Sequence, residues 1–183
     1  MATVANVSAG KPRVGGAVYW GTMTLTAPTS ADATLPAGFN DVGYISDAGV
    51  TNANTRTNES VKAWGGDEVL NMQTEYTDHY TFTMIEMLNT NVLKAVRGED
   101  NVEGDLTTGL HVKANSKELE NHIWVIDQIL TGGVLSRFVI PDGKIIEIAE
   151  VTFADNSAVG YQVTVAARPD AGGDSHHEYY KSA

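Results

Sequence analysis

The sequence predicts a mainly β protein: a β-sandwich or barrel with one flanking α-helix, a long inter-strand loop and extended terminal arms. β-Branched residues are abundant, and valine is about twice as frequent as isoleucine or leucine. Such side chains pack well on a pleated sheet. Glycine and asparagine recur between short stretches of alternating apolar and polar residues, as expected for strands joined by turns.

The chain is expected to fold as one domain between two arms. Its 183 residues are a usual length for a single core. Residues 1–12 are small and polar and predict an N-terminal arm, residues 13–168 the domain, and residues 169–183 a flexible C-terminal tail. Leu, Ile, Val and Phe together supply only 42 of the 183 residues. This share is close to the roughly 20% below which chains tend to stay disordered. Such a thin core indicates that neighbouring subunits complete the fold.

The first part of the domain combines a strand with two polar segments. Residues 13–20 predict the first strand, and residues 26–40 contain two prolines and several small residues typical of a loop. Residues 41–68 predict a long inter-strand loop, because residues 51–60 include no bulky apolar side chain. Loops of this length in compact domains are usually functional. We expect this loop and the N-terminal arm to become ordered only on assembly.

The middle of the chain carries the clearest periodic signals. Residues 69–86 alternate with a period of two and predict a long strand or hairpin. Residues 89–97 predict a short helix, with Asn89 or Thr90 as its N-cap and Gly98 after its end. The apolar face of the strand consists of Tyr76, Tyr80, Phe82 and Met84.

The segment that follows is less uniform. Residues 99–105 predict an acidic loop, and residues 106–114 a strand. For residues 116–131 two interpretations remain open: a strand over 120–129, which the β-branched and aromatic residues favour, or a helix that ends at Gly132-Gly133.

Three strands are expected in the C-terminal third. Residues 134–140 and 144–153 predict a hairpin around the turn Pro141-Asp142-Gly143, because proline presets φ and glycine accepts a left-handed conformation. After a second turn at residues 155–157, the last strand spans residues 159–168, with alternate apolar side chains on one face.

Charge and composition exclude several functions. The net charge is −11, and residues 66–183 carry all of it. Binding nucleic acid through its phosphates requires clustered Lys and Arg, so this protein can surround DNA but not grip it. It has no cysteine, which excludes disulfides and thiol catalysis. The sequence shows neither a signal peptide nor an apolar run long enough to cross a bilayer, so we expect synthesis in the cytoplasm.

Five motifs occur in an order that resembles a known family. They are residues 41–50, residues 62–67, the junction of residues 85–94, residues 137–144 and residues 158–165. In this order they resemble the major tail proteins, or tail tube proteins, of long-tailed siphophages, in particular those that infect actinobacteria. The resemblance covers most of residues 13–170.

The resemblance implies a structural virion protein without catalytic activity or cofactor. In that family strands of six subunits form an inner β-barrel around a channel, rings stack into a hollow tube, and loops and terminal arms bridge the rings. The implied partners are the protein itself, the tape measure protein, and the tail terminator and tail tip proteins, with transient non-specific passage of double-stranded DNA and no membrane. Some acidic residues of 69–86 and 134–153 are expected to face the channel.

The long polar loop is the candidate self-assembly interface. It is too polar to fold alone, yet it contains a few apolar and aromatic residues that can anchor a contact, and aromatic anchors dominate interface energetics. The candidate interface residues are Tyr44, Ile45, Val50, Trp64, Gly65 and Gly66.

Catalytic and metal-binding alternatives have weaker support. His176 and His177, with Asp174 and Glu178 nearby, suggest metal ligands, but a flexible tail must be ordered before it can bind. His79, His111 and His122 fall on separate predicted strands. A carboxylate pair for hydrolysis would have to come from Glu75, Asp78, Glu147 and Glu150, and no motif of a hydrolase, nucleotide-binding or zinc protease site is present.

The main alternative function is a carbohydrate- or protein-binding β-sandwich module, such as a phage decoration or adhesin domain. Its binding platform would be formed by Trp20, Trp64 and Trp124.

Overall fold

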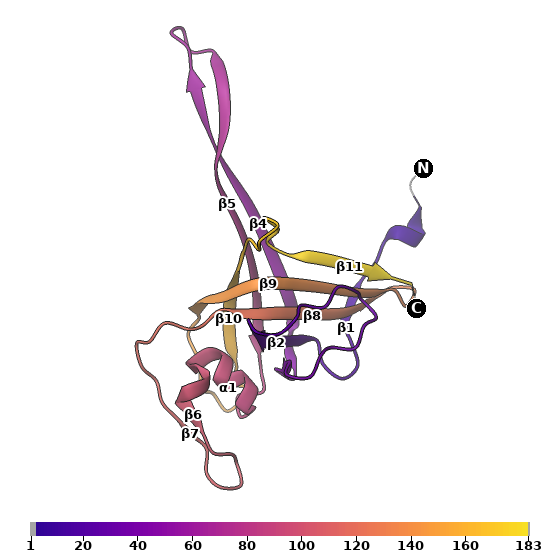
Figure 1. Ribbon diagram of the computed structural model, residues 1–183, viewed down its shortest axis with the longest axis vertical. Coiled ribbons are helices and arrows are strands. Elements are labelled where there is room, and N and C mark those ends of the chain that lie inside the picture. Colours follow the sequence, from indigo (N-terminus) through magenta and orange to yellow (C-terminus); the bar gives the residue numbers. More distant parts are fainter. Residues whose placement is uncertain (1–2, 183) are drawn as a thin grey trace.

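The structure is a computed structural model that describes residues 3–182. Within this part of the chain, nine strands form one antiparallel sheet in the order β3-β2-β8-β9-β10-β5-β4, with β1 also paired to β8 and β11 also paired to β9 (Figure 1). A second sheet consists of β6 and β7 alone. The predicted mainly β fold with one short α-helix is therefore confirmed.

The main sheet contains strands of very different length. They are β1 (Gly10–Pro12), β2 (Val18–Thr22), β3 (Asn40–Asp41), β4 (Ile45–Lys62), β5 (Glu68–Met84), β8 (His122–Leu130), β9 (Leu135–Ile148), β10 (Tyr161–Arg168) and β11 (His177–Lys181). The other elements are the helix α1 (Thr90–Arg97), the small strands β6 (Val102–Glu103) and β7 (His111–Val112), and the 3-10 turns η1 (Val4–Asn6) and η2 (Glu99–Asn101).

Both faces of the central strands are covered. Helix α1 packs its buried side chains Val92 and Val96 on one face, in a core that includes Trp20 and Trp124. The Trp20 indole donates a hydrogen bond to the carbonyl of Asn91 at 3.0 Å, which ties the helix to the sheet. The loop of residues 23–39 covers the other face, over a smaller core around Ile123, Val125 and Val139. Burial on both sides explains why the first six residues of β8 are all buried.

The helix and three strands follow the sequence signals. The Asn89 side chain accepts a hydrogen bond from the backbone of Asn91 at 3.0 Å, and Gly98 follows the helix with a φ of 91°. The strand interpretation of residues 120–129 is correct, because β8 occupies that position. Strands β5 and β10 show the predicted alternation over residues 78–84 and 161–165.

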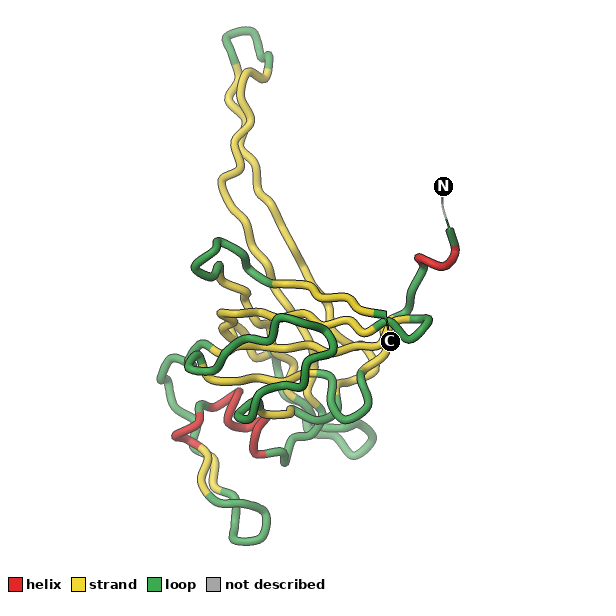
Figure 2. The backbone as a smooth tube through the Cα atoms, turned by 45° about the vertical axis from the view of Figure 1, so that its right-hand side comes forward, coloured by secondary structure: helices red, strands yellow, loops and turns green. Residues whose placement is uncertain are grey.

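The predicted long loop of residues 41–68 is wrong, because most of it is strand β4. This strand pairs with β5 from Ile45 to Lys62 and forms a hairpin that projects far from the body (Figures 1 and 2). Its polar residues pair with β5 along the strand, with two register shifts in the distal part, although they bury almost nothing. Sequence periodicity reports burial, and a ribbon exposed on both faces has no such signal.

The predicted turn at Pro141-Asp142-Gly143 is also wrong, because β9 continues through it. The register shifts there, from His122 opposite Gly143 to Trp124 opposite Ile140, so β9 contains one extra residue. Proline is tolerated at such a bulge. Glycine is required at position 143, because an added Cβ would lie 2.5 Å from Cδ1 of Trp124.

The ends of the chain and one middle segment differ from expectation as well. The predicted flexible tail of residues 169–183 contains β11, which pairs with Leu135–Val139 of β9. The end of the predicted N-terminal arm pairs as β1 with β8, while residues 3–9 add no strand to the sheet. The strand predicted over residues 13–20 corresponds to β2, which begins only at Val18. Of residues 106–114, only His111–Val112 is a strand.

Candidate self-assembly surface

The predicted interface residues lie at the two ends of one strand. Tyr44 precedes β4, and Ile45 and Val50 belong to its first residues, whereas Trp64, Gly65 and Gly66 form the turn after its end. A strand of 18 residues spans roughly 55 Å at about 3.3 Å per residue. The structure therefore divides the predicted interface into a base and a tip.

The tip is a tight turn that holds an aromatic side chain in solvent. The backbone N–H of Ala63 donates to the carbonyl of Asp67 at 2.8 Å, and that of Gly66 to the carbonyl of Ala63 at 3.0 Å. Gly65 and Gly66 have φ values of 117° and 97°, which only glycine adopts readily. The Trp64 side chain is fully exposed, at 107%.

One face of the distal hairpin carries a cluster of apolar side chains. Val61 lies directly opposite Leu70, and Glu59 lies opposite Met72. Because opposite residues share a face and residues two apart along a strand share it too, Val61, Leu70 and Met72 form one cluster, which we call the distal apolar patch. All three are exposed, at 44%, 50% and 43%. Apolar side chains clustered in this way mark a contact surface.

The opposite face of the hairpin is polar and rich in amides. The Asn54 side chain donates to the Tyr76 hydroxyl at 2.7 Å, and the Arg56 guanidinium lies over the Tyr76 ring at 4.6 Å. Arg56 also donates to the Gln73 side chain at 3.4 Å. These contacts fix side chains but bury little apolar surface, and a two-stranded hairpin without a core is marginally stable in water.

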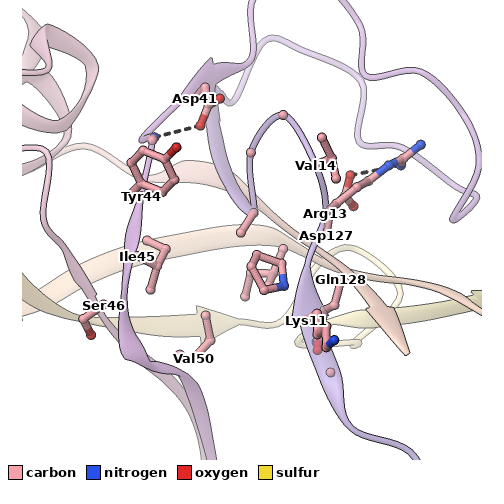
Figure 3. A pocket seen from close by; sticks show the side chains of 18 of the residues that line it. Lys11, Arg13, Val14, Asp41, Tyr44, Ile45, Ser46, Val50, Asp127 and Gln128 are labelled. Atoms are coloured by element: carbon pink, nitrogen blue, oxygen red, sulfur yellow. Dashed lines mark hydrogen bonds and ion pairs between the residues drawn. The ribbon is translucent and has the colours of Figure 1, made fainter. Parts of the chain in front are cut away.

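The base of the hairpin borders a groove of about 970 Å³. The segment 10–17 forms one wall, residues 43–50 form the other, and Ile126–Gln128 of β8 lie between them (Figure 3). The ladder between β4 and β5 skips residues 46–49, so no β5 residue is paired with this stretch. Tyr44 stands at this groove with 76% of its surface exposed.

Ion pairs fix the walls of the groove. Arg137 is 1% exposed and binds both carboxylate oxygens of Asp127, at 2.6 and 2.8 Å. Its other nitrogen donates to the carbonyls of Ser30 and Ala33 at 2.9 and 2.8 Å. Arg13, in the first wall, reaches the same carboxylate at 3.4 Å. No local sequence motif marks this cluster, because Arg13 lies 114 positions from Asp127 and Ser30 lies 107 positions from Arg137.

A histidine attaches the C-terminal segment to the hairpin. Nδ1 of His176 lies 2.5 Å from a carboxylate oxygen of the buried Asp78, and Nε2 lies 3.2 Å from Glu178. The second Asp78 oxygen accepts a hydrogen bond from Asn52 at 2.7 Å. Since Asn52 belongs to β4 and Asp78 to β5, this contact joins both hairpin strands to the segment before β11.

The structure does not assemble the candidate hydrolase site. Asp78 is engaged by His176 and Asn52, Glu75 lies on the exposed part of β5, and Glu147 lies on β9. Among the described residues no hydrogen bond joins any two of the four acids proposed above.

The three predicted strand histidines and the tryptophans have separate locations. His79 lies in β5, and His111 lies in β7, 3.8 Å from Glu103. His122 is buried beside the rings of Trp20 and Trp124, and this burial lowers its pKa. Because both tryptophans are 0% exposed, they cannot form a binding platform with Trp64. Within residues 3–182 no helix has the length and apolar character needed to cross a membrane.

These features define a class of protein. A sheet that extends into an exposed, uncovered ribbon with a groove at its base indicates a β protein that binds another protein surface. The sequence matches the phage tail tube protein family over residues 8–181, and the chain therefore belongs to this family. It is a structural, non-enzymatic component of the virion that self-assembles and forms the tail tube.

Among solved structures, the chain is similar to the cap that terminates the tube of an anti-feeding prophage, determined by cryo-electron microscopy. It is 12% identical, the alignment covers 100% of both chains, and the TM-score is 0.42. No curated protein matches the sequence.

Proposed function

We propose that this protein forms stacked rings of six subunits around a DNA channel, as in long-tailed siphophages that infect actinobacteria, and that the β4–β5 hairpin connects one subunit to another. The observation that carries this proposal is the exposure of the distal hairpin. Every residue from 51 to 76 is exposed on the folded subunit. A ribbon of this kind needs a partner surface to become rigid.

The tip and the groove are the two halves of the proposed contact. The tip offers Trp64 and the distal apolar patch, and the groove offers Tyr44, Ile45 and Val50. They lie roughly 55 Å apart along one strand of 18 residues, so a tip cannot fill the groove of its own subunit. A contact between two different surfaces of identical subunits is heterologous, and such contacts generate rings or helical filaments.

The N-terminal arm supplies a second connection. Val4 and Val7 are 87% and 73% exposed, and the arm leaves the sheet toward the same end of the molecule as the hairpin (Figures 1 and 2). The N-terminal arm and the β4–β5 hairpin would therefore both contact the next ring.

Acidic residues suit the channel. With a net charge of −11, a tube of these subunits repels the DNA phosphates and lets DNA pass without stopping. Exposed Glu75 on β5 and Glu147 on β9 are the candidates for the channel wall. The tape measure protein would occupy the channel before DNA, and the tail terminator and tail tip proteins would close its two ends.

Electron microscopy of a hairpin-shortened variant tests the proposal. Thr55 lies directly opposite Thr77, so residues 56–76 can be replaced by Asn-Gly, which favours a two-residue hairpin turn. The wild type is expected to form rings or hollow tubes as its concentration rises. The shortened variant should remain a folded monomer, with an unchanged thermal transition of the body.

Two results would contradict the proposal. Tubes of the shortened variant would show that the hairpin is dispensable. A wild type that stays monomeric at high concentration, and also fails to extend tube fragments added as seeds, would show that the rings require another protein.

A further inference from the structure

We propose that the turn between β10 and β11 binds one first-row divalent metal ion through Asp170, Asp174 and His177. One carboxylate oxygen of each aspartate and one ring nitrogen of His177 lie within 4.8 Å of one another. The site lies outside the hairpin and the groove, and the proposal does not depend on tube formation.

The spacing of the ligand atoms fits a metal site. Nε2 of His177 lies 3.3 Å from Oδ2 of Asp170. Ligand atoms that bind one tetrahedral ion at about 2.1 Å are about 3.4 Å apart. Asp174 is exposed, so its carboxylate can rotate into the third position without displacing packed atoms.

Asp170 is held as a ligand before any ion arrives. Its Oδ1 accepts hydrogen bonds from the backbone of Asp174 at 3.0 Å and Gly172 at 2.7 Å. These bonds use one oxygen and leave Oδ2 directed toward His177.

His177 is equally well placed. It is the first residue of β11 and pairs with Val139 of β9. The cost of ordering a flexible tail, which argued against a metal in the sequence, is therefore already met by the β9–β11 ladder. The neighbouring His176 is not available as a ligand, because Asp78 and Glu178 contact both of its ring nitrogens.

The donor set selects the type of ion. One imidazole and two carboxylates suit zinc and its first-row neighbours, whereas Ca²⁺ prefers six or more oxygen ligands. Three protein ligands leave at least one position for water. A bound ion would link the turn of residues 170–174 to the start of β11 and so fasten the C-terminal strand to the sheet.

Calorimetric titration of Zn²⁺ into the untagged full-length protein tests the site. We expect one ion per chain, and a loss of affinity of at least about tenfold in His177→Gln and in Asp174→Asn, since even indirect support of a metal is worth about 10- to 100-fold. His111→Gln and Asp155→Asn remove a histidine and an aspartate elsewhere and should bind like the wild type. Zn²⁺ should raise the thermal unfolding temperature of the wild type and both controls, but not of His177→Gln.

Several results of these titrations would contradict the proposed metal site. Unchanged Zn²⁺ affinity in His177→Gln or Asp174→Asn would place the ion elsewhere on the acidic surface and overturn the proposal, as would no binding at millimolar Zn²⁺. Equal binding of Ca²⁺ by the wild type and His177→Gln, tighter than that of Zn²⁺, would indicate a carboxylate site without the histidine. Circular dichroism of each variant separates lost ligation from lost folding. The visible spectrum of bound Co²⁺, compared between the wild type and His177→Gln, shows whether removing the imidazole changes the coordination.

Discussion

Replacing Trp64 by alanine should raise the concentration needed for assembly without affecting the folded subunit. The indole is fully exposed, at 107%, in the turn at the tip of the hairpin. Substitutions at such surface positions change the free energy of unfolding by no more than about 0.5 kcal/mol. Any large effect of this change must therefore arise in the contact between subunits.

The size of that effect follows from the area of the side chain. A tryptophan that becomes buried removes about 200 Å² from water, which at about 25 cal/mol per Å² is worth about 5 kcal/mol. Aromatic residues at the centres of interfaces commonly contribute about 2–4 kcal/mol. Since a factor of ten corresponds to about 1.4 kcal/mol, the critical concentration for assembly should rise about 30- to 700-fold.

Sedimentation of a concentration series, with light scattering in parallel, measures the critical concentration. Trp64→Phe keeps an aromatic ring and should fall between alanine and the wild type. Phe153, which is 71% exposed outside the hairpin, provides the matched control Phe153→Ala. The reasoning is refuted if Trp64→Ala assembles at the wild-type concentration, or if Phe153→Ala impairs assembly to the same degree.

Three further changes probe the body of the subunit. Arg137→Met leaves the buried Asp127 carboxylate with a single, more distant guanidinium, and urea denaturation should show a loss of about 3–5 kcal/mol, with partial recovery when Asp127→Leu is added. Gly143→Ala places a Cβ 2.5 Å from Trp124 and should cost about 1–3 kcal/mol by the same assay; a neutral result would mean that the bulge can move. Because burial lowers the pKa of His122 below 6.5, the unfolded state binds more protons than the native state, so stability should fall as pH drops below that value. His122→Phe should make the pH dependence shallower between pH 7 and 5, and an identical slope would show that other groups cause it.

Local signals in the sequence were sufficient to predict an element that packs on the core by itself. The helix of Thr90–Arg97 has its own cap and apolar stripe, and β10 has a strict alternation of buried positions. Local signals failed in strand β9. Pro141-Asp142-Gly143 is a typical turn sequence, but β8 and β10 pair with β9 on both sides there, and the three residues form a bulge within the strand. Context from the rest of the sheet overrides the local preference there.

The candidate surface was predicted only in part for a related reason. Trp64 and Tyr44 stand out in the sequence as anchors, but most of the hairpin between them buries neither face, so its sequence has no regular apolar period. Contacts such as Asp78 with His176 join residues 98 positions apart. A single sequence does not indicate that two residues so far apart are in contact.

In the proposed assembly of stacked rings, the uncovered hairpin also affects when the tube can grow. Fixing the backbone of one residue costs about 1–2 kcal/mol, so two free subunits that meet in solution must order their ribbons and orient each other at once. A finished ring presents surfaces that are already rigid, and an arriving subunit orders only its own ribbon. We therefore expect slow nucleation and rapid elongation, so that the host cell can accumulate free subunits until a starting ring is supplied.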